Sequence, residues 1–185
     1  MTAVRPAVVL CGAMGSGKSA VGRRLATRIG LPFRDVDADV EASAGRTIAE
    51  IFASDGEAHF RDLEHDAVAR ALTEHPGVLS LGGGAVMDPR TQSVLADYRA
   101  DGGLVVLLDV SLRYAMHRIG SAASRPMLAD DPRERWTRIL AARRPTYERV
   151  SNLVVDTDQR TLGAVVREIA ARLGVDEAAS PDEGC

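Results

Sequence analysis

Residues 12–19 read Gly-Ala-Met-Gly-Ser-Gly-Lys-Ser, and this stretch decides how the rest of the chain is interpreted. It matches the phosphate-binding loop pattern G-x-x-x-x-G-K-[ST] at every fixed position. An apolar run at residues 7–11 precedes it and helix-compatible sequence follows at 20–26. In a strand–loop–helix of this kind, successive backbone N–H groups surround a phosphate at the start of the helix. The segment therefore predicts a triphosphate site, formed by Gly12, Ala13, Met14, Gly15, Ser16, Gly17, Lys18, Ser19 and Ala20.

A dinucleotide-binding fingerprint is the competing interpretation of the same residues. Gly15, Gly17 and Ala20 fit the pattern G-x-G-x-x-[GA], and Asp37 follows Gly17 by 20 residues, where a ribose-binding acid is expected. That fingerprint places its first glycine directly after the strand, a place that Gly12 takes here. The triphosphate loop is therefore favoured, with Lys18 at the β- and γ-phosphates and the Ser19 hydroxyl on Mg²⁺.

Length and composition indicate one small α/β domain. The chain has 185 residues, 45% of them hydrophobic, and a net charge of −3, so we expect a single domain over residues 1–175 and a disordered acidic tail at 176–185. The absence of a basic excess excludes nucleic acid and an anionic membrane as main partners. The apolar runs are too short to span a bilayer and no signal peptide is evident, so we expect a cytoplasmic protein. We also expect a monomer. Two cysteines, Cys11 and Cys185, support neither a disulfide framework nor a thiolate metal site.

Apolar segments alternate with helical sequence along the whole chain. Strands are predicted at 4–11, 32–37, 78–81, 103–109 and 152–156. The first helix follows the loop and ends near residue 29, and further main helices are predicted at about 57–72, 89–98, 111–119, 132–144 and 162–173. Strands separated by helices form a parallel sheet with right-handed crossovers. We therefore predict a three-layer P-loop NTPase fold, a five-stranded parallel sheet flanked by helices.

Two carboxylates end the second predicted strand. Asp35 and Asp37 are separated by one residue, and on an extended segment such residues project to the same face. One could hold Mg²⁺ and the other could orient or deprotonate an attacking hydroxyl. The alternative is that one or both cap the helix that follows.

Further motifs fall at the same edge of the predicted sheet. Gly82, Gly83 and Gly84 follow the third strand, where missing side chains let a ligand or a backbone approach closely. A segment of small residues with two prolines and Arg125, at about 120–132, could close over substrates as a lid. Paired carboxylates, a glycine strip and an arginine lid beside a phosphate loop favour a small-molecule kinase.

Four blocks of sequence together resemble the shikimate kinase family, from about residue 8 to residue 173. They are the loop at 12–19, Asp35-Val36-Asp37, Phe60-Arg61 with Gly82-Gly83-Gly84, and Arg125-Pro126-Met127-Leu128 with Arg143-x-Pro145-x-Tyr147. The loop is shared by many kinases, whereas the combination is specific. The resemblance implies a substrate-binding helical segment at about 35–63, a lid at about 119–131, and ATP-dependent phosphorylation of the 3-hydroxyl of shikimate.

The resemblance also implies roles for individual residues. Asp37, Arg61, Gly83 and Arg143 would hold shikimate, beside Gly82, Gly84, Phe52 and Phe60, and Asp37 would be the general base. Lys18 and Arg125 would neutralise the transferring phosphoryl group, and Arg118 would stack on adenine. Ser19 and Asp35 would hold one Mg²⁺ ion per subunit. Leu162 stands where the family has a proline near the adenine.

Two other classes of function stay open at this point. One is a related P-loop kinase with another acceptor, such as gluconate or a nucleoside monophosphate, which has no special need for Asp37, Arg61 and Arg143 together. The other is a non-catalytic nucleotide-binding module, which would keep Lys18 and Ser19 but could lose the acceptor residues. All of the acceptor residues are present, so we expect ATP and shikimate as the ligands.

Overall fold

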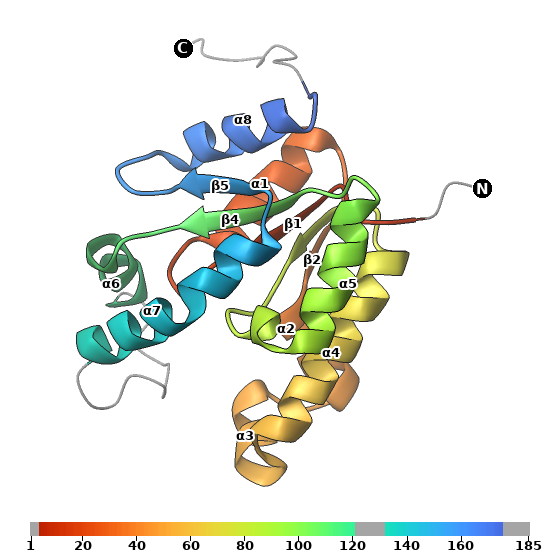
Figure 1. The fold of residues 1–185 in the computed structure, drawn as a ribbon, viewed down its shortest axis with the longest axis vertical. Coiled ribbons are helices and arrows are strands. Elements are labelled where there is room, and N and C mark those ends of the chain that lie inside the picture. Colours follow the sequence, from red (N-terminus) through yellow and green to blue (C-terminus); the bar gives the residue numbers. More distant parts are fainter. Residues whose placement is uncertain (1–3, 121–131, 176–185) are drawn as a thin grey trace.

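Five parallel strands form the sheet that organises the computed structural model, which describes residues 4–120 and 132–175 (Figure 1). The strands are β1 (Val8–Cys11), β2 (Phe33–Asp35), β3 (Val78–Ser80), β4 (Val105–Asp109) and β5 (Leu153–Asp156). They lie in the order β2-β3-β1-β4-β5, so that every connection between consecutive strands passes through helical sequence. The predicted five-stranded parallel sheet is confirmed.

Helices cover both faces of this sheet. They are α1 (Lys18–Ile29), α2 (Val36–Ala44), α3 (Ile48–Ser54), α4 (Gly56–Glu74), α5 (Pro89–Ala100), α6 (Leu112–Gly120), α7 (Pro132–Val150) and α8 (Leu162–Arg172), with a 3₁₀ turn at Ala85–Met87. Helices α1 and α8 pack on one face, and α4, α5 and α7 on the other (Figure 1). Helix α3 lies at the end of α4 that is farthest from the sheet (Figure 1).

The core is divided between the two faces by the alternation of side chains along each strand. In β1, Val8 and Leu10 pack against α1 and α8, whereas Val9 and Cys11 pack against α4 and α5. All four side chains are buried, as expected for a strand in the middle of a parallel sheet. Burial also raises the pKa of the Cys11 thiol to about 12, against the opposing effect of Lys18.

The predicted start of the first strand and the predicted end of helix α7 were wrong. The first strand begins at Val8 and not at residue 4, since Val4 is exposed and Pro6 has no backbone N–H for a ladder. Helix α7 continues through Pro145 to Val150, beyond the predicted end at residue 144. An interior proline costs roughly 3 kcal/mol, and the burial of Tyr147 and Val150, at about 1.5–3 kcal/mol each, offsets that cost.

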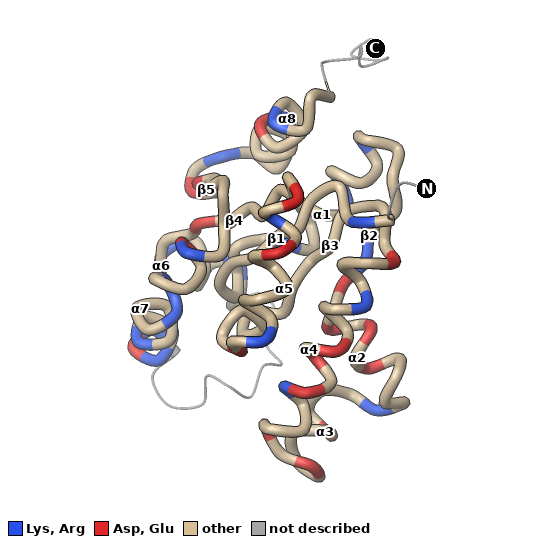
Figure 2. The backbone as a smooth tube through the Cα atoms, turned by 45° about the vertical axis from the view of Figure 1, so that its right-hand side comes forward, with Lys and Arg blue, Asp and Glu red and all other residues tan. Residues whose placement is uncertain are grey.

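Charged residues of both signs are spread over the helices, with basic residues frequent on α7 (Figure 2). None of the described helices combines the length and the apolar content that a membrane crossing requires. The predicted tail at 176–185, and residues 121–131 of the predicted lid, lie outside the described residues.

Candidate active site

The phosphate loop joins β1 to α1 and depends on glycine at several positions. Gly12, Gly15 and Gly17 have φ angles of 144°, 85° and 91°, a region that favours glycine. A Cβ atom on Gly12 would also lie 2.6 Å from the carbonyl oxygen of Leu108. The Lys18 ammonium reaches back over the loop and donates to the carbonyl oxygen of Gly12 at 2.8 Å. The Lys18 ammonium and the start of α1 therefore lie beside the concave backbone of the loop.

A cavity of about 390 Å³ opens above this loop. It is lined by the loop, the start of α1 and the ends of two neighbouring strands. The lining residues are Met14, Gly15, Gly17, Lys18, Ser19, Ala20, Asp35, Asp37, Ser80, Leu81, Gly83 and Arg118. We call it the donor cavity, because backbone N–H groups at a helix start and two cationic side chains are suited to phosphates.

The Ser19 hydroxyl and the Asp35 carboxylate meet at the edge of the donor cavity. Ser19 Oγ donates to Asp35 Oδ2 at 3.1 Å. Two hard oxygen atoms beside a phosphate site fit Mg²⁺, which takes few protein ligands and completes its shell with water and phosphate oxygens. Among the described residues, no group of three or more His, Cys, Asp or Glu side chains is placed to hold a metal.

The two carboxylates after β2 are arranged differently from the prediction. Strand β2 ends at Asp35, and Asp37 lies in the first turn of α2. Asp35 caps that helix, because its Oδ1 accepts the backbone N–H of Asp37 at 3.1 Å. The premise of one extended segment is therefore wrong, and the capping alternative holds for Asp35. Both side chains nevertheless line the donor cavity, since the first turn of α2 lies at the same sheet edge.

A second cavity, of about 160 Å³, lies beside the first. Its walls come from α3, α4, α7 and the glycine strip, and most of them are apolar. The lining residues are Ala13, Met14, Asp37, Ile48, Phe52, Phe60, Arg61, Glu64, Gly83, Gly84, Trp136, Ile139, Leu140, Arg143 and Tyr147. We call it the acceptor cavity. Met14, Asp37 and Gly83 line both cavities, so the Asp37 carboxylate lies where the two meet.

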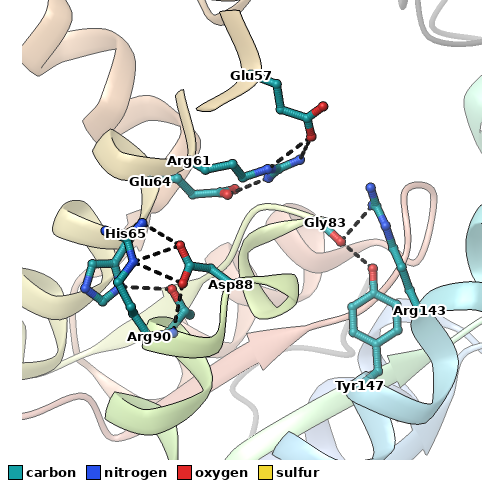
Figure 3. Close-up of polar contacts among 10 residues, drawn as sticks. Glu57, Arg61, Glu64, His65, Gly83, Asp88, Arg90, Arg143 and Tyr147 are labelled. Carbon is teal, nitrogen blue, oxygen red and sulfur yellow. Dashed lines mark hydrogen bonds and ion pairs between the residues drawn. The ribbon is translucent and has the colours of Figure 1, made fainter. Parts of the chain in front are cut away.

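Arg61 is held in the acceptor cavity by two glutamates of its own helix (Figure 3). Its Nη1 donates to Glu64 at 2.6 Å and its Nη2 to the exposed Glu57 at 3.1 Å. The Glu64 side chain is only 3% exposed, and burial raises the pKa of this carboxyl although Arg61 acts in the opposite direction. The sequence interpretation missed Glu64 among the charges of α4. Its spacing from Phe60 and Ala67 places it on the buried stripe of the helix.

Arg143 and Tyr147 reach the acceptor cavity from α7 and meet at one backbone atom. Both donate to the carbonyl oxygen of Gly83, Arg143 Nη1 at 3.0 Å and Tyr147 through its hydroxyl (Figure 3). Burial raises the pKa of Tyr147 to about 12, so the phenol stays a donor at neutral pH. This contact ties α7 to the glycine strip and aims one guanidinium into the cavity.

The remaining predicted acceptor residues are packed around these groups. A Cβ atom on Gly84 would lie 2.5 Å from Arg61 Nη1, and one on Gly82 would lie 2.6 Å from Asp37 Oδ1. Gly82 thus leaves space for the carboxylates of Asp37 and Glu64. It is not among the lining residues of either cavity. The rings of Phe52 and Phe60 stack with centroids 4.7 Å apart and form the apolar wall.

Arg118 lies at the far end of the donor cavity, away from the acceptor. Its Nη2 donates to the carbonyl oxygen of Thr157 at 2.8 Å, and its Nη1 to that of Gly15 at 3.2 Å. A further hollow of about 280 Å³ continues from there and includes Leu162. The predicted lid residue Arg125 lies outside the described part of the chain.

Comparisons with known proteins agree with this arrangement. The shikimate kinase family model matches residues 14–174. A shikimate kinase of Mycobacterium avium is 49% identical over 174 residues, 94% of this chain and 96% of the relative. One of Streptomyces coelicolor is 50% identical over 156 residues, 84% and 88% of the two chains. The solved structure of shikimate kinase from Acinetobacter baumannii in complex with shikimate superposes with a TM-score of 0.84 at 28% identity, covering 95% of this chain and 96% of that one. The chain belongs to the shikimate kinase family, a family of P-loop kinases.

Proposed function

We propose that the chain transfers the γ-phosphoryl group of ATP to the 3-hydroxyl of shikimate, giving shikimate 3-phosphate and ADP. The observation that carries this proposal is the junction of the two cavities, where Met14, Asp37 and Gly83 line both. A carboxylate placed between a triphosphate site and a second pocket can meet a hydroxyl group and a phosphoryl group together. Positioning of this kind supplies most of the catalysis in phosphoryl transfer.

On the donor side, the loop residues 12–20 hold the phosphates of ATP with their backbone N–H groups. Lys18 turns from the carbonyl oxygens of the loop to the phosphates, and Arg125 of the lid joins it against the charge of the transferring group. Arg118 stacks on the adenine of ATP. Ser19 and Asp35, whose oxygens are 3.1 Å apart, would hold one Mg²⁺ ion, which would supply positive charge against the phosphates of ATP.

On the acceptor side, shikimate brings one carboxylate and several hydroxyl groups. Arg61 and Arg143 enter the cavity from two different helices, and two guanidiniums fork well onto a carboxylate. Phe52 and Phe60 cover the ring of the substrate, and Gly83 and Gly84, which line the cavity, leave room for it. Both arginines are already held in place by Glu64 and by the Gly83 carbonyl oxygen, which lowers the ordering cost of binding.

Asp37 then acts at the reacting hydroxyl group. The oxygen of the 3-hydroxyl attacks the γ-phosphorus, its proton passes to the Asp37 carboxylate, and the bond to the β-phosphate oxygen breaks to release ADP. General-base assistance of this type contributes about 10²- to 10⁴-fold. We also propose a monomer as the active form.

The acceptor is tested by measuring ADP release with Mg-ATP and one acceptor at a time: shikimate, gluconate or a nucleoside monophosphate. We expect turnover with shikimate and background rates with the other two. Release of ADP that does not depend on shikimate, or faster release with either other acceptor, would remove the proposal.

A further inference from the structure

Trp136 is the one tryptophan of the chain and lies on α7, where it lines the acceptor cavity. Its side chain is buried, and the indole Nε1–H donates to the carbonyl oxygen of Met14 at 3.0 Å. Met14 belongs to the phosphate loop and lines both cavities. A hydrogen bond thus joins the loop that binds the donor to the helix that carries Arg143.

The ring of Trp136 has two sets of neighbours. One side of it lines the acceptor cavity. It also packs with Val110 and with Ala115, which lies on α6, the helix that carries Arg118. Arg143 follows Trp136 by seven residues on α7, which places both on the same face of the helix. Helix α7 is therefore bonded to the phosphate loop at Trp136 and to the glycine strip at Arg143.

The phosphate loop has its own reason to change when a nucleotide binds. Lys18 Nζ donates to the carbonyl oxygens of Gly12 at 2.8 Å and Ala13 at 3.2 Å, and phosphate oxygens compete for the same ammonium. These two peptides immediately precede Met14, whose carbonyl oxygen accepts the indole N–H. A rearrangement of the loop around bound phosphate therefore moves the Met14 carbonyl oxygen, to which the indole N–H donates.

We propose that Trp136 is a positioning residue that couples the two substrate sites. Its hydrogen bond to Met14 holds α7, and with it Arg143, in register with the phosphate loop, so that a nucleotide at the loop and shikimate in the acceptor cavity strengthen each other's binding. This inference rests on the proposed placement of the two substrates. A neutral hydrogen bond supports a coupling of about 3- to 10-fold in affinity, and the factor is the same in both directions.

The test compares calorimetric dissociation constants for shikimate, with and without saturating Mg-ADP, in the wild-type protein and in Trp136→Phe. Phenylalanine keeps an aromatic ring and removes the N–H donor. We expect the 3- to 10-fold tightening by Mg-ADP in the wild type to fall below about 1.5-fold in the variant. A loss of packing alone would change both dissociation constants and leave their ratio as it was. Leu112→Ala is the matched control, because Leu112 packs against the same cluster without lining either cavity, and it keeps the wild-type ratio.

A measurement on the wild type needs no variant at all. Since the chain has a single tryptophan, its fluorescence reports on Trp136 alone, and both Mg-ADP and shikimate, each added by itself, are expected to change the emission. A wild-type ratio of one, an unchanged ratio in Trp136→Phe, or an emission insensitive to either bound ligand overturns the inference and leaves the proposed function standing. Failure of shikimate to bind under any condition overturns both.

Discussion

Replacing Glu64 with glutamine removes one charge from the acceptor cavity and keeps the shape of the side chain. The 2.6 Å bond from Arg61 then joins a neutral oxygen. A charge-assisted bond contributes about 1.5–3 kcal/mol and a neutral one about 0.5–1.5 kcal/mol. The hydrogen bond that orients Arg61 is therefore weakened by roughly 1–1.5 kcal/mol. We expect the KM for shikimate to rise about 5- to 10-fold, with a smaller change in kcat, because Glu64 acts through Arg61 and not on the phosphoryl group.

The matched control is Glu57→Gln, on the same helix and paired with the same guanidinium. Glu57 is 68% exposed, against 3% for Glu64, and exposed pairs contribute little. Initial rates of ADP release over a range of shikimate concentrations are expected to show less than a twofold change in KM for this control. Equal changes in the two variants, or no change in Glu64→Gln, would refute the role given to the buried carboxylate.

Stability provides an independent check on the same substitution. Burial raises the pKa of Glu64 above the usual 4.5, so the folded state binds this proton more tightly than the unfolded chain does. The contribution of Glu64 to the free energy of unfolding is therefore greatest below pH 4.5 and declines as the pH rises through the raised pKa. Glutamine does not titrate. In urea unfolding, the stability of Glu64→Gln relative to wild type is expected to increase between pH 4 and pH 7, and a decrease would mean that the pairing outweighs the burial.

Three further predictions concern other parts of the site. Asp37→Asn is expected to lower the turnover at least about 10²-fold while the calorimetric Kd for Mg-ADP stays within about twofold; wild-type turnover would remove the general-base role. Gly84→Ala places a Cβ atom 2.5 Å from Arg61 Nη1, whereas the Cβ atom of the comparison variant Gly83→Ala has its nearest neighbour at 3.7 Å. Circular dichroism melts should show both variants folded, and shikimate titrations should show weaker binding in Gly84→Ala because the Arg61 guanidinium is displaced. Arg144→Ala removes a two-bond pair with Asp109, at 3.1 and 2.8 Å, and half-exposed pairs of this kind contribute about 0.5–1 kcal/mol. The thermal midpoint should fall by about 1–4 °C, and by less in 1 M salt.

The elements that the sequence predicts well are those specified by local chemistry. The loop at 12–19 needs a lysine and positive φ angles at three separate glycines, Gly12, Gly15 and Gly17. The apolar strands need only hydrophobic side chains between turns. The gathering of motifs at one edge of the sheet then follows from parallel connectivity. Asp35 and Asp37 were placed at the right edge for a wrong reason, since the boundary between strand and helix falls between them. A shift of one or two residues at such a boundary is beyond pattern reasoning.

What the sequence could not show depends on tertiary packing. Glu64 looks like one charge among many on α4, and only the depth to which α4 is buried makes it the inner partner of Arg61. Pro145 predicts the end of a helix, and only the burial of Tyr147 beyond it shows why α7 continues. Trp136 carries no motif, because its partner is a backbone carbonyl oxygen 122 residues earlier in the chain.

The glycine strip at 82–84 shows how one short segment orders the whole acceptor side. Gly82 leaves space for the Asp37 and Glu64 carboxylates, and Gly84 leaves space for the Arg61 guanidinium. Gly83 contributes its carbonyl oxygen, which accepts from both Arg143 and Tyr147. None of the three has a positive φ angle, so the backbone conformation does not require glycine. Space for neighbouring charged groups explains Gly82 and Gly84. The Asp37 carboxylate, the two guanidinium groups of Arg61 and Arg143, and helix α7 are thus positioned around three consecutive residues that follow β3.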